Sequence, residues 1–155
     1  KRLNKVRENA ARLQLNSIKI EVGDSRELER FHNLADRVLL DAPCSGLGTL
    51  HKRPDIRWRQ TSQAVESLFE LQRELIEQTA LCVKPKGVLV YATCTLNVLE
   101  NEKVVQSFLK NNLNWSIDPN NAIAQNWATS EGWIKIYPHQ SNMDGFFMVR
   151  LVRNQ

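Results

Sequence analysis

Cysteine is scarce in this chain of 155 residues: the three cysteines stand at positions 44, 82 and 94, and no pair has Cys-x-x-Cys spacing. An odd number with such wide spacing argues against a disulfide framework and against a zinc site, so we expect no metal. Reduced thiols are typical of the cytosol, and we expect a cytoplasmic protein. Cys82 lies in the apolar stretch TALCVK, which favours a buried, unreactive thiol.

Long hydrophobic runs are absent as well. No apolar stretch approaches the roughly 20 residues that cross a bilayer, and the chain opens with KRLNKVRENAARL, which is charged and unlike a signal peptide. Glycine and proline, with six and five residues, form no linker that would divide the chain. We therefore expect no membrane association and one domain over residues 1–155.

The positive charge of the chain is unevenly distributed. The formal net charge is +4, and residues 1–60 contain 13 Lys and Arg against 8 Asp and Glu. The excess is densest in the segment HKRPDIRWRQ, residues 51–60, which we call the basic segment. Its basic residues are Lys52, Arg53, Arg57 and Arg59, against Asp55 alone. Such a segment suits a phosphate backbone, although a solvated surface loop has the same composition.

Hydrophobic periodicity predicts helices that alternate with strands. We expect helices over residues 3–14, 62–82 and 97–111, the last beginning at a capping box formed by Asn97 and Glu100. Expected strands are SIKIEV, RVLLDA, GVLVYAT, WIKIYP and GFFMVRLV. This order indicates an α/β fold in which helices connect the strands of one sheet.

Polar turns follow three of the predicted strands. Asp24 ends the first, and the turns at residues 41–46 and 93–95 contain Cys44 and Cys94. Ligands of α/β sheets bind at the carboxyl ends of the strands, so we expect the two thiols to face one pocket. A helix beginning just after Cys94 would favour its thiolate form. Either cysteine could instead be a small buried residue without a chemical role.

Four motifs in the same order resemble those of the RNA cytosine-5 methyltransferases: DAPCSGLGTL, RPDIRW, YATCTL and MDGFF. The similarity is strongest to bacterial members that act on 16S ribosomal RNA, and it extends over most of the chain. The family implies a Rossmann-like α/β fold, S-adenosylmethionine as methyl donor and a cytidine in RNA as substrate.

The resemblance also implies roles for single residues. Cys94 matches the family's nucleophile, Cys44 matches the cysteine that assists product release, and Asp41 matches the acid that contacts the cytosine ring. The donor is expected to contact Asp24, Asp41 and Pro43. Expected RNA contacts are Lys52, Arg53, Arg57, Arg59 and His139, with Asp144 at the rim of the pocket. Trp58 could stack on a base, although a tryptophan is more often part of the core.

The family's glycine-rich donor loop has no counterpart in this sequence. The only Gly-x-Gly, at residues 46–48, follows the wrong strand and has no third glycine nearby. We therefore expect a fold truncated at the N-terminus, without its first two strands, and weak or no donor binding by this chain alone. The segment IKIEV would lose its neighbours, so we expect it to pair elsewhere, to associate with another chain through the unpaired edge, or to be loosely held.

Two other functions fit the same sequence. A DNA cytosine-5 methyltransferase would have its nucleophile in a Pro-Cys turn like that of Cys44, but it would not require Cys94. A non-catalytic RNA-binding or regulatory fragment would keep the fold without a donor site. The intact pair of cysteines and the basic segment favour the RNA methyltransferase.

Overall fold

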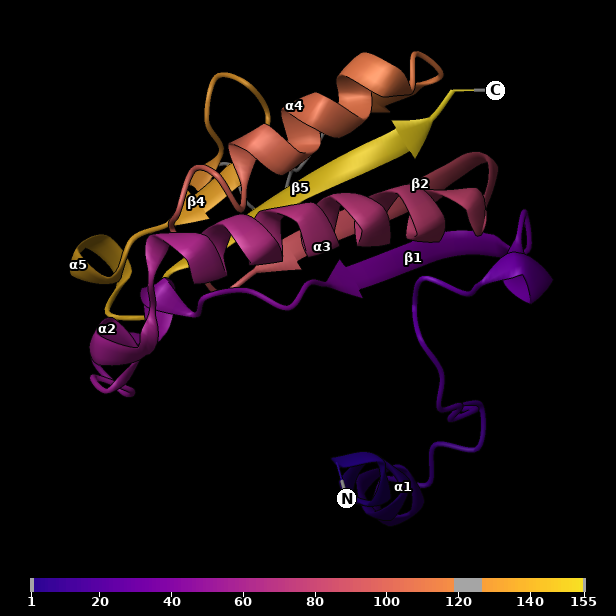
Figure 1. Cartoon of the computed structure of the whole chain (residues 1–155). Coiled ribbons are helices and arrows are strands. Elements are labelled where there is room, and N and C mark those ends of the chain that lie inside the picture. The colour runs from indigo at the N-terminus through magenta and orange to yellow at the C-terminus, as the bar shows by residue number, and fades with distance from the viewer. Residues whose placement is uncertain (1, 119–126, 155) are drawn as a thin grey trace.

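A mixed five-stranded sheet forms the centre of the fold (Figure 1). The structure, a computed structural model, describes residues 2–118 and 127–154. Neighbouring strands follow the order β1-β2-β5-β3, and β4 also pairs with β5. The strands are β1 (Ala35–Asp41), β2 (Val83–Thr93), β3 (Trp115–Ile117), β4 (Ile134–Ile136) and β5 (Phe146–Arg153).

The strands that precede the two cysteine turns run parallel and side by side. Asp41, the last residue of β1, lies opposite Ala92 near the end of β2. Because parallel strands end at the same edge of a sheet, the turns after Asp41 and Thr93 emerge next to each other. On its other side β2 pairs antiparallel with β5, where Tyr91 lies opposite Val149. Strand β2 thus lies between β1 and β5, and its residue Tyr91 is fully buried.

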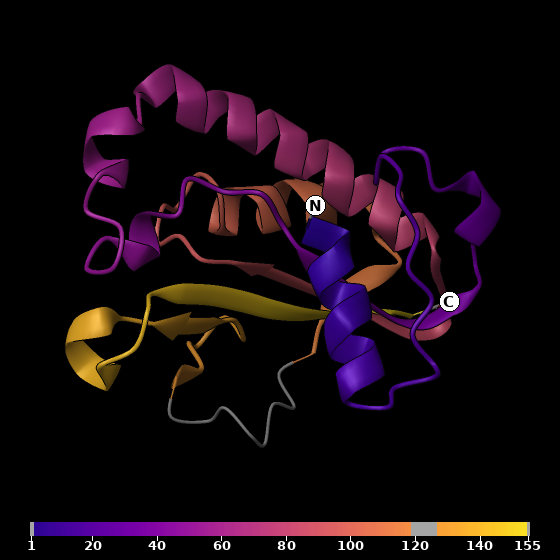
Figure 2. The same cartoon turned by 90° about the horizontal axis from the view of Figure 1, so that it is seen from below.

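Helices α3 and α4 pack on the sheet and on each other, whereas α1 stands apart from them (Figures 1 and 2). α3 connects β1 to β2, and its first turn is capped by Thr61, whose hydroxyl oxygen accepts a hydrogen bond from the Ala64 N–H. The helices are α1 (Arg2–Arg12), α2 (Ile56–Arg59), α3 (Ser62–Leu81), α4 (Glu102–Asn111) and α5 (Pro138–Ser141), with short 3-10 turns at Glu29–Phe31 and Leu47–Thr49. No helix in the described ranges is long and apolar enough to cross a membrane.

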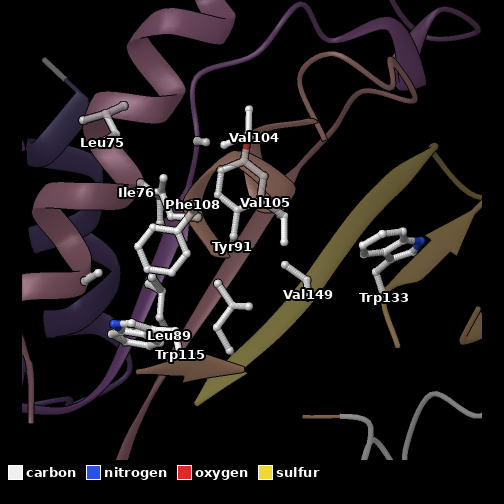
Figure 3. Packing of buried hydrophobic residues seen from close by; sticks show 14 of the residues in the cluster. Leu75, Ile76, Leu89, Tyr91, Val104, Val105, Phe108, Trp115, Trp133 and Val149 are labelled. Carbon is white, nitrogen blue, oxygen red and sulfur yellow. The ribbon is translucent and has the colours of Figure 1, made fainter. Parts of the chain in front are cut away.

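The core lies between the sheet and the helices α3 and α4 (Figure 3). Ile76 of α3 and Phe108 of α4 are almost completely buried. Phe108 meets Trp115 of β3 edge-on, with ring centroids 5.5 Å apart. Such an edge-to-face pair adds about 0.5–1.5 kcal/mol beyond the burial of its surface. This packing anchors α4, and thereby the loop before it, against the sheet.

The α/β class and most of the predicted elements are confirmed. Four of the five expected strands form, and β3 is a further strand that the sequence did not predict. Helix α3 ends at Leu81, because the residues that follow, including Lys84–Gly87 with Pro85, belong to strand β2. The predicted capping box at Asn97 is wrong, since α4 begins only at Glu102 and the Asn97 side chain accepts a hydrogen bond from the Leu99 N–H instead. Cys82 is buried, as predicted.

The predicted strand at residues 17–22 does not form. This segment pairs with no strand of the described sheet, and Ile18 and Val22 are 45% and 80% exposed. A strand needs a neighbour for its backbone groups, and the side of β1 facing away from β2 has no partner strand among the described residues. Pairing elsewhere within the described chain is thus excluded, and association through the free edge of β1 stays a prediction.

Candidate active site

The two thiols at the strand ends face each other. The Sγ atoms of Cys44 and Cys94 are 3.4 Å apart, and both side chains are partly exposed to solvent. This confirms the expectation that the parallel strands β1 and β2 bring the two cysteines together. They are free cysteines, so the contact is a hydrogen bond between thiols.

The Cys44 thiol is stabilised in its protonated form. Burial, followed by the hydrogen bond to Cys94, raises the pKa of the Cys44 thiol to about 12. The low dielectric around a buried thiol disfavours its charged form. Cys44 therefore keeps its proton at neutral pH and can donate it in the hydrogen bond to the sulfur of Cys94.

A buried carboxylate connects the two cysteine turns. Glu100, which is fully buried, accepts hydrogen bonds from the backbone N–H of Ser45 at 2.7 Å and from its hydroxyl at 2.5 Å. The Thr95 hydroxyl lies 2.9 Å from the Ser45 hydroxyl and 3.4 Å from the Glu100 carboxylate. Ser45 follows Cys44 and Thr95 follows Cys94, so one carboxylate fixes the residues next to both thiols.

Two further side chains hold this arrangement from outside. The amide of Gln72 on α3 donates to the Pro43 carbonyl at 2.8 Å and to Glu100 at 3.2 Å. Asn101, at the start of α4, accepts from the Thr93 hydroxyl at 2.6 Å and donates to the Thr95 carbonyl at 3.0 Å. Pro43, before Cys44, is thus tied to α3, and Thr93 and Thr95, on the two sides of Cys94, are tied to the start of α4.

The backbone packs tightly beside Cys94. The Gly48 N–H donates to the Cys94 carbonyl at 3.0 Å, and the Gly145 N–H donates to the Gly48 carbonyl at 2.8 Å. A Cβ atom on Gly48 would lie 2.2 Å from the Gly145 oxygen and 2.8 Å from the Cys94 oxygen. Only glycine fits there. The motifs DAPCSGLGTL, YATCTL and MDGFF therefore meet at one point.

The expected donor-binding residues are divided between two places. Asp41 and Pro43 are exposed at the carboxyl edge of β1, next to Cys44. Asp24 is not brought to this edge: its carboxylate pairs with Arg26, which lowers the pKa of that carboxyl to about 2, and Arg26 in turn approaches Glu74 on α3. Of the three residues expected to contact the donor, Asp41 and Pro43 thus lie next to Cys44, and Asp24 pairs with Arg26.

The basic segment lies at the same end of the fold as the thiols. Lys52 and His51 contact Asp144 at 2.8 and 3.4 Å, and this pairing lowers the pKa of the Asp144 carboxyl. Arg59 pairs with Asp55. All of the predicted RNA contacts are exposed to solvent, namely Lys52, Arg53, Arg57, Arg59 and His139. Of the two roles considered for Trp58, burial in the core is wrong, because this side chain is 84% exposed.

A cavity lies near the two cysteine turns. It has a volume of about 570 Å³ and lies between the basic segment, the start of α3 and the loop after β2, and neither cysteine lines it. No group of metal-ligating side chains occurs in the part of the chain that the structure describes. The chemistry at the strand ends is therefore that of thiols, a carboxylate and backbone groups.

Comparison with known proteins identifies the family. The family model of the 16S rRNA methyltransferase RsmB/F matches residues 1–152. The chain belongs to the RsmB/F family. The probable ribosomal RNA small subunit methyltransferase B of Synechocystis sp. is 43% identical to it over 97% of the chain. The ribosomal RNA small subunit methyltransferase B of Shewanella oneidensis is 38% identical over 99%. The chain spans only 35% of the length of each of these relatives.

A solved structure has the same fold. NSun6 from Pyrococcus horikoshii, in its crystal structure with SFG, superposes with a TM-score of 0.86 at 31% identity. The match covers 99% of this chain and 39% of that one. The predicted Rossmann-like methyltransferase fold, of which this RsmB/F chain contains a part, is thereby confirmed.

Sequence reasoning missed the residues that hold the two thiols in place. These are Ser45, Gln72, Glu100, Asn101 and Gly145. Glu100 was assigned to a helix cap because its spacing from Asn97 fits one. The nearest signal in the sequence was the group of polar residues in TLNVLENE directly after Cys94, since buried polar groups need hydrogen-bond partners.

Proposed function

We propose that the protein containing this chain methylates C5 of a cytidine in 16S ribosomal RNA, with S-adenosylmethionine as methyl donor. The family and the names of the curated relatives support the reaction and the substrate. NSun6, whose crystal structure includes the S-adenosylmethionine analogue SFG, supports the donor. The observation that carries the mechanism is the contact of 3.4 Å between the thiols of Cys44 and Cys94.

Cys94 is the proposed nucleophile. C5 of cytosine is too weakly nucleophilic to accept a methyl group directly, and addition of a thiolate to C6 makes C5 an enamine carbon. This is covalent catalysis, which divides one difficult step into two easier ones. S-adenosylmethionine supplies the methyl group. Asp41, exposed at the end of β1 beside the thiols, is the proposed partner of ring N3, where a proton donor assists the addition.

Cys44 is proposed to act in product release. After methylation the C5 proton passes to a base, the electrons of the C5–H bond restore the C5=C6 double bond, and the C6–S bond breaks with its electrons on the sulfur of Cys94. Because its pKa is raised to about 12, Cys44 remains a thiol and can donate a hydrogen bond to that departing sulfur. Without it, the covalent adduct is expected to persist.

Donor binding by this chain alone is proposed to be weak. Asp41 and Pro43 lie where a donor beside the thiols would contact them, but Asp24 is paired with Arg26 away from that edge. A calorimetric titration of the isolated chain with S-adenosylmethionine tests this. No measurable heat is expected, and a micromolar affinity would contradict the proposal.

The roles of the cysteines can be tested on a denaturing gel. The protein as its gene encodes it is incubated with 16S ribosomal RNA and S-adenosylmethionine, as wild type, Cys94→Ala, Cys44→Ala and the double variant. A heat-stable protein–RNA band is expected for Cys44→Ala and for neither variant that lacks Cys94. Cys82→Ala is the control for loss of a thiol. Equal behaviour of Cys44→Ala and Cys94→Ala would refute the assignment.

A non-catalytic RNA-binding module is the second candidate, and the position of Asp24 away from the thiols favours it. The same gel separates the two, because such a module retains RNA under native conditions but gives no covalent band with Cys44→Ala. In a DNA cytosine-5 methyltransferase the nucleophile would be Cys44, so the covalent band would depend on Cys44 and would form on DNA.

A further inference from the structure

A groove runs along the basic segment beside the thiols. Its larger part is the cavity of about 570 Å³, a volume in the range of roughly 300–1,000 Å³ that is usual for ligand sites. Its apolar side chains are Leu47, Leu50, Val65 and Leu99, and its polar and charged ones are Arg57, Gln60, Thr61, Ser62, Glu66 and Asn97. Apolar walls with a few amide and guanidinium groups suit a planar, partly polar ligand.

A second hollow continues this groove. It has a volume of about 220 Å³ and is lined by Leu50, Pro54, Arg57 and Trp58, so it shares Leu50 and Arg57 with the larger cavity. Trp58 is 84% exposed, and helix α2 buries none of its residues. A large indole left in water at the mouth of a groove is available to stack on a ligand.

The charge at the junction of the two hollows is positive. No acidic side chain among the described residues forms an ion pair with Arg57, whereas Arg59 next to it pairs with Asp55. The guanidinium of Arg57 is therefore free to bind an anion. A planar cation beside an exposed indole is the combination that proteins use for single-stranded nucleic acid.

The groove is connected to the catalytic turns. The Gln60 amide on its wall donates to the Ser45 carbonyl at 3.1 Å. Asn97, which also lines the groove, follows Cys94 by three residues, and its backbone N–H donates to the Thr95 hydroxyl at 3.3 Å. A ligand in the groove thus lies next to both turns without entering the space between the thiols.

We propose that this groove binds the unpaired nucleotides that flank the target cytidine, with one base stacked on Trp58, its phosphate at Arg57, and the neighbouring base between Leu50 and Asn97. The inference rests on the proposed function, since it takes RNA as the substrate. Bases in loops are already unstacked, and a flipped target leaves its neighbours without a stacking partner. An aromatic platform beside the catalytic turns would hold those neighbours and fix the register of the target.

The test measures binding and chemistry separately. A fluorescein-labelled oligocytidine RNA is titrated by anisotropy with the protein as its gene encodes it, as wild type, Trp58→Ala, Trp58→Phe and Arg57→Gln. Trp58→Ala is expected to weaken binding about tenfold, and Trp58→Phe to retain most of the affinity. Arg57→Gln is expected to lower the slope of log K against log salt by about 0.7, the contribution of one phosphate contact to a single strand.

Two control variants match these changes in chemistry but lie elsewhere. Leu113→Ala removes an apolar side chain that is 88% exposed, and Arg12→Gln removes an exposed arginine of α1. Both are expected to bind RNA like the wild type. Unchanged RNA affinity of Trp58→Ala would overturn the inference. An indole that another part of the protein covers would give this same result, and the inference would be wrong in that case too.

The two proposals fail in different ways. In a Cys44→Ala background, Trp58→Ala should form the same amount of covalent adduct at saturating RNA and less at low RNA. Absence of any adduct in that background would count against the proposed methyl transfer. The anisotropy data would still test whether the groove binds RNA. Normal adduct with unchanged affinity and unchanged RNA dependence would refute the groove alone.

Discussion

The carboxylate of Glu100 accepts hydrogen bonds from both the backbone N–H and the hydroxyl of Ser45, across 55 positions of the chain. It thereby connects the turn that holds Cys44 to the segment that follows Cys94. The distance of 3.4 Å between the thiols depends on this buried link as well as on the parallel strands β1 and β2. One buried side chain thus ties the backbone after Cys44 to the segment that follows Cys94.

Replacement of this carboxylate should be costly. In Glu100→Gln an NH₂ group stands where a carboxylate oxygen accepted hydrogen bonds, so a donor of Ser45 or Gln72 loses its acceptor. A buried donor without a partner costs about 1–3 kcal/mol, and we expect that loss in the free energy of unfolding measured with urea. The adduct band of Cys44→Ala should also weaken when Glu100→Gln is added.

The matched control is Glu70→Gln on the exposed side of α3. Glu70 pairs with Arg73 at the surface, and such pairs contribute about 0–1 kcal/mol. If Glu100→Gln changed stability as little as this control, Glu100 would not hold the two turns together.

Gly48 should tolerate no side chain. A Cβ atom at this position would meet the backbone oxygens of Gly145 and Cys94, which cannot rotate away. Gly48→Ala is therefore expected to lower the free energy of unfolding by about 1–3 kcal/mol and to reduce adduct formation at Cys94. The control is Gly23→Ala, where nothing lies within 4 Å of the added Cβ. Equal unfolding curves for the two variants would contradict the close packing beside Cys94.

Stability should depend on alkaline pH through Cys44. The folded-state pKa of this thiol is about 12 against an ordinary value of 9.0, because burial disfavours the thiolate. As the pH rises above 9.0 the unfolded chain loses this proton first, so the free energy of unfolding falls between pH 9.0 and about 12.

The measurement compares wild type with Cys44→Ala. Urea unfolding of both proteins from about pH 8 to about pH 10.5 should show the wild type losing stability faster, so the cost of Cys44→Ala shrinks as the pH rises. Cys82, whose pKa is also raised by burial, is common to both proteins and cancels in the comparison. Parallel pH profiles would mean that the Cys44 thiol is not held in its protonated form.

The sequence predicted the parts of this fold that follow from local patterns. Short apolar runs mark β1, β2 and β5, and parallel strands necessarily end at one edge, so the meeting of Cys44 and Cys94 could be predicted. Four motifs were enough to suggest the family. The role of Glu100 could not be predicted, because its partner Ser45 is remote in sequence while its spacing from Asn97 fits a local cap.

The other differences have the same cause. Residues 17–22 have the composition of a strand, but a strand forms only beside a partner, and the described sheet offers none. Tryptophan is a residue type often found in cores, yet α2 buries none of its residues and Trp58 is exposed. In both cases tertiary surroundings, which a local pattern does not contain, decided the outcome.

We propose Cys94 as the nucleophile in the methylation of a cytidine in 16S ribosomal RNA. Bisulfite mapping of 5-methylcytidine in that RNA tests it directly, in the source organism with the native gene and with the Cys94 codon changed to Ala. The Cys82→Ala gene serves as the control for loss of a thiol. We expect one 5-methylcytidine signal to disappear with Cys94→Ala and to persist in the control. An unchanged pattern with Cys94→Ala would contradict the account.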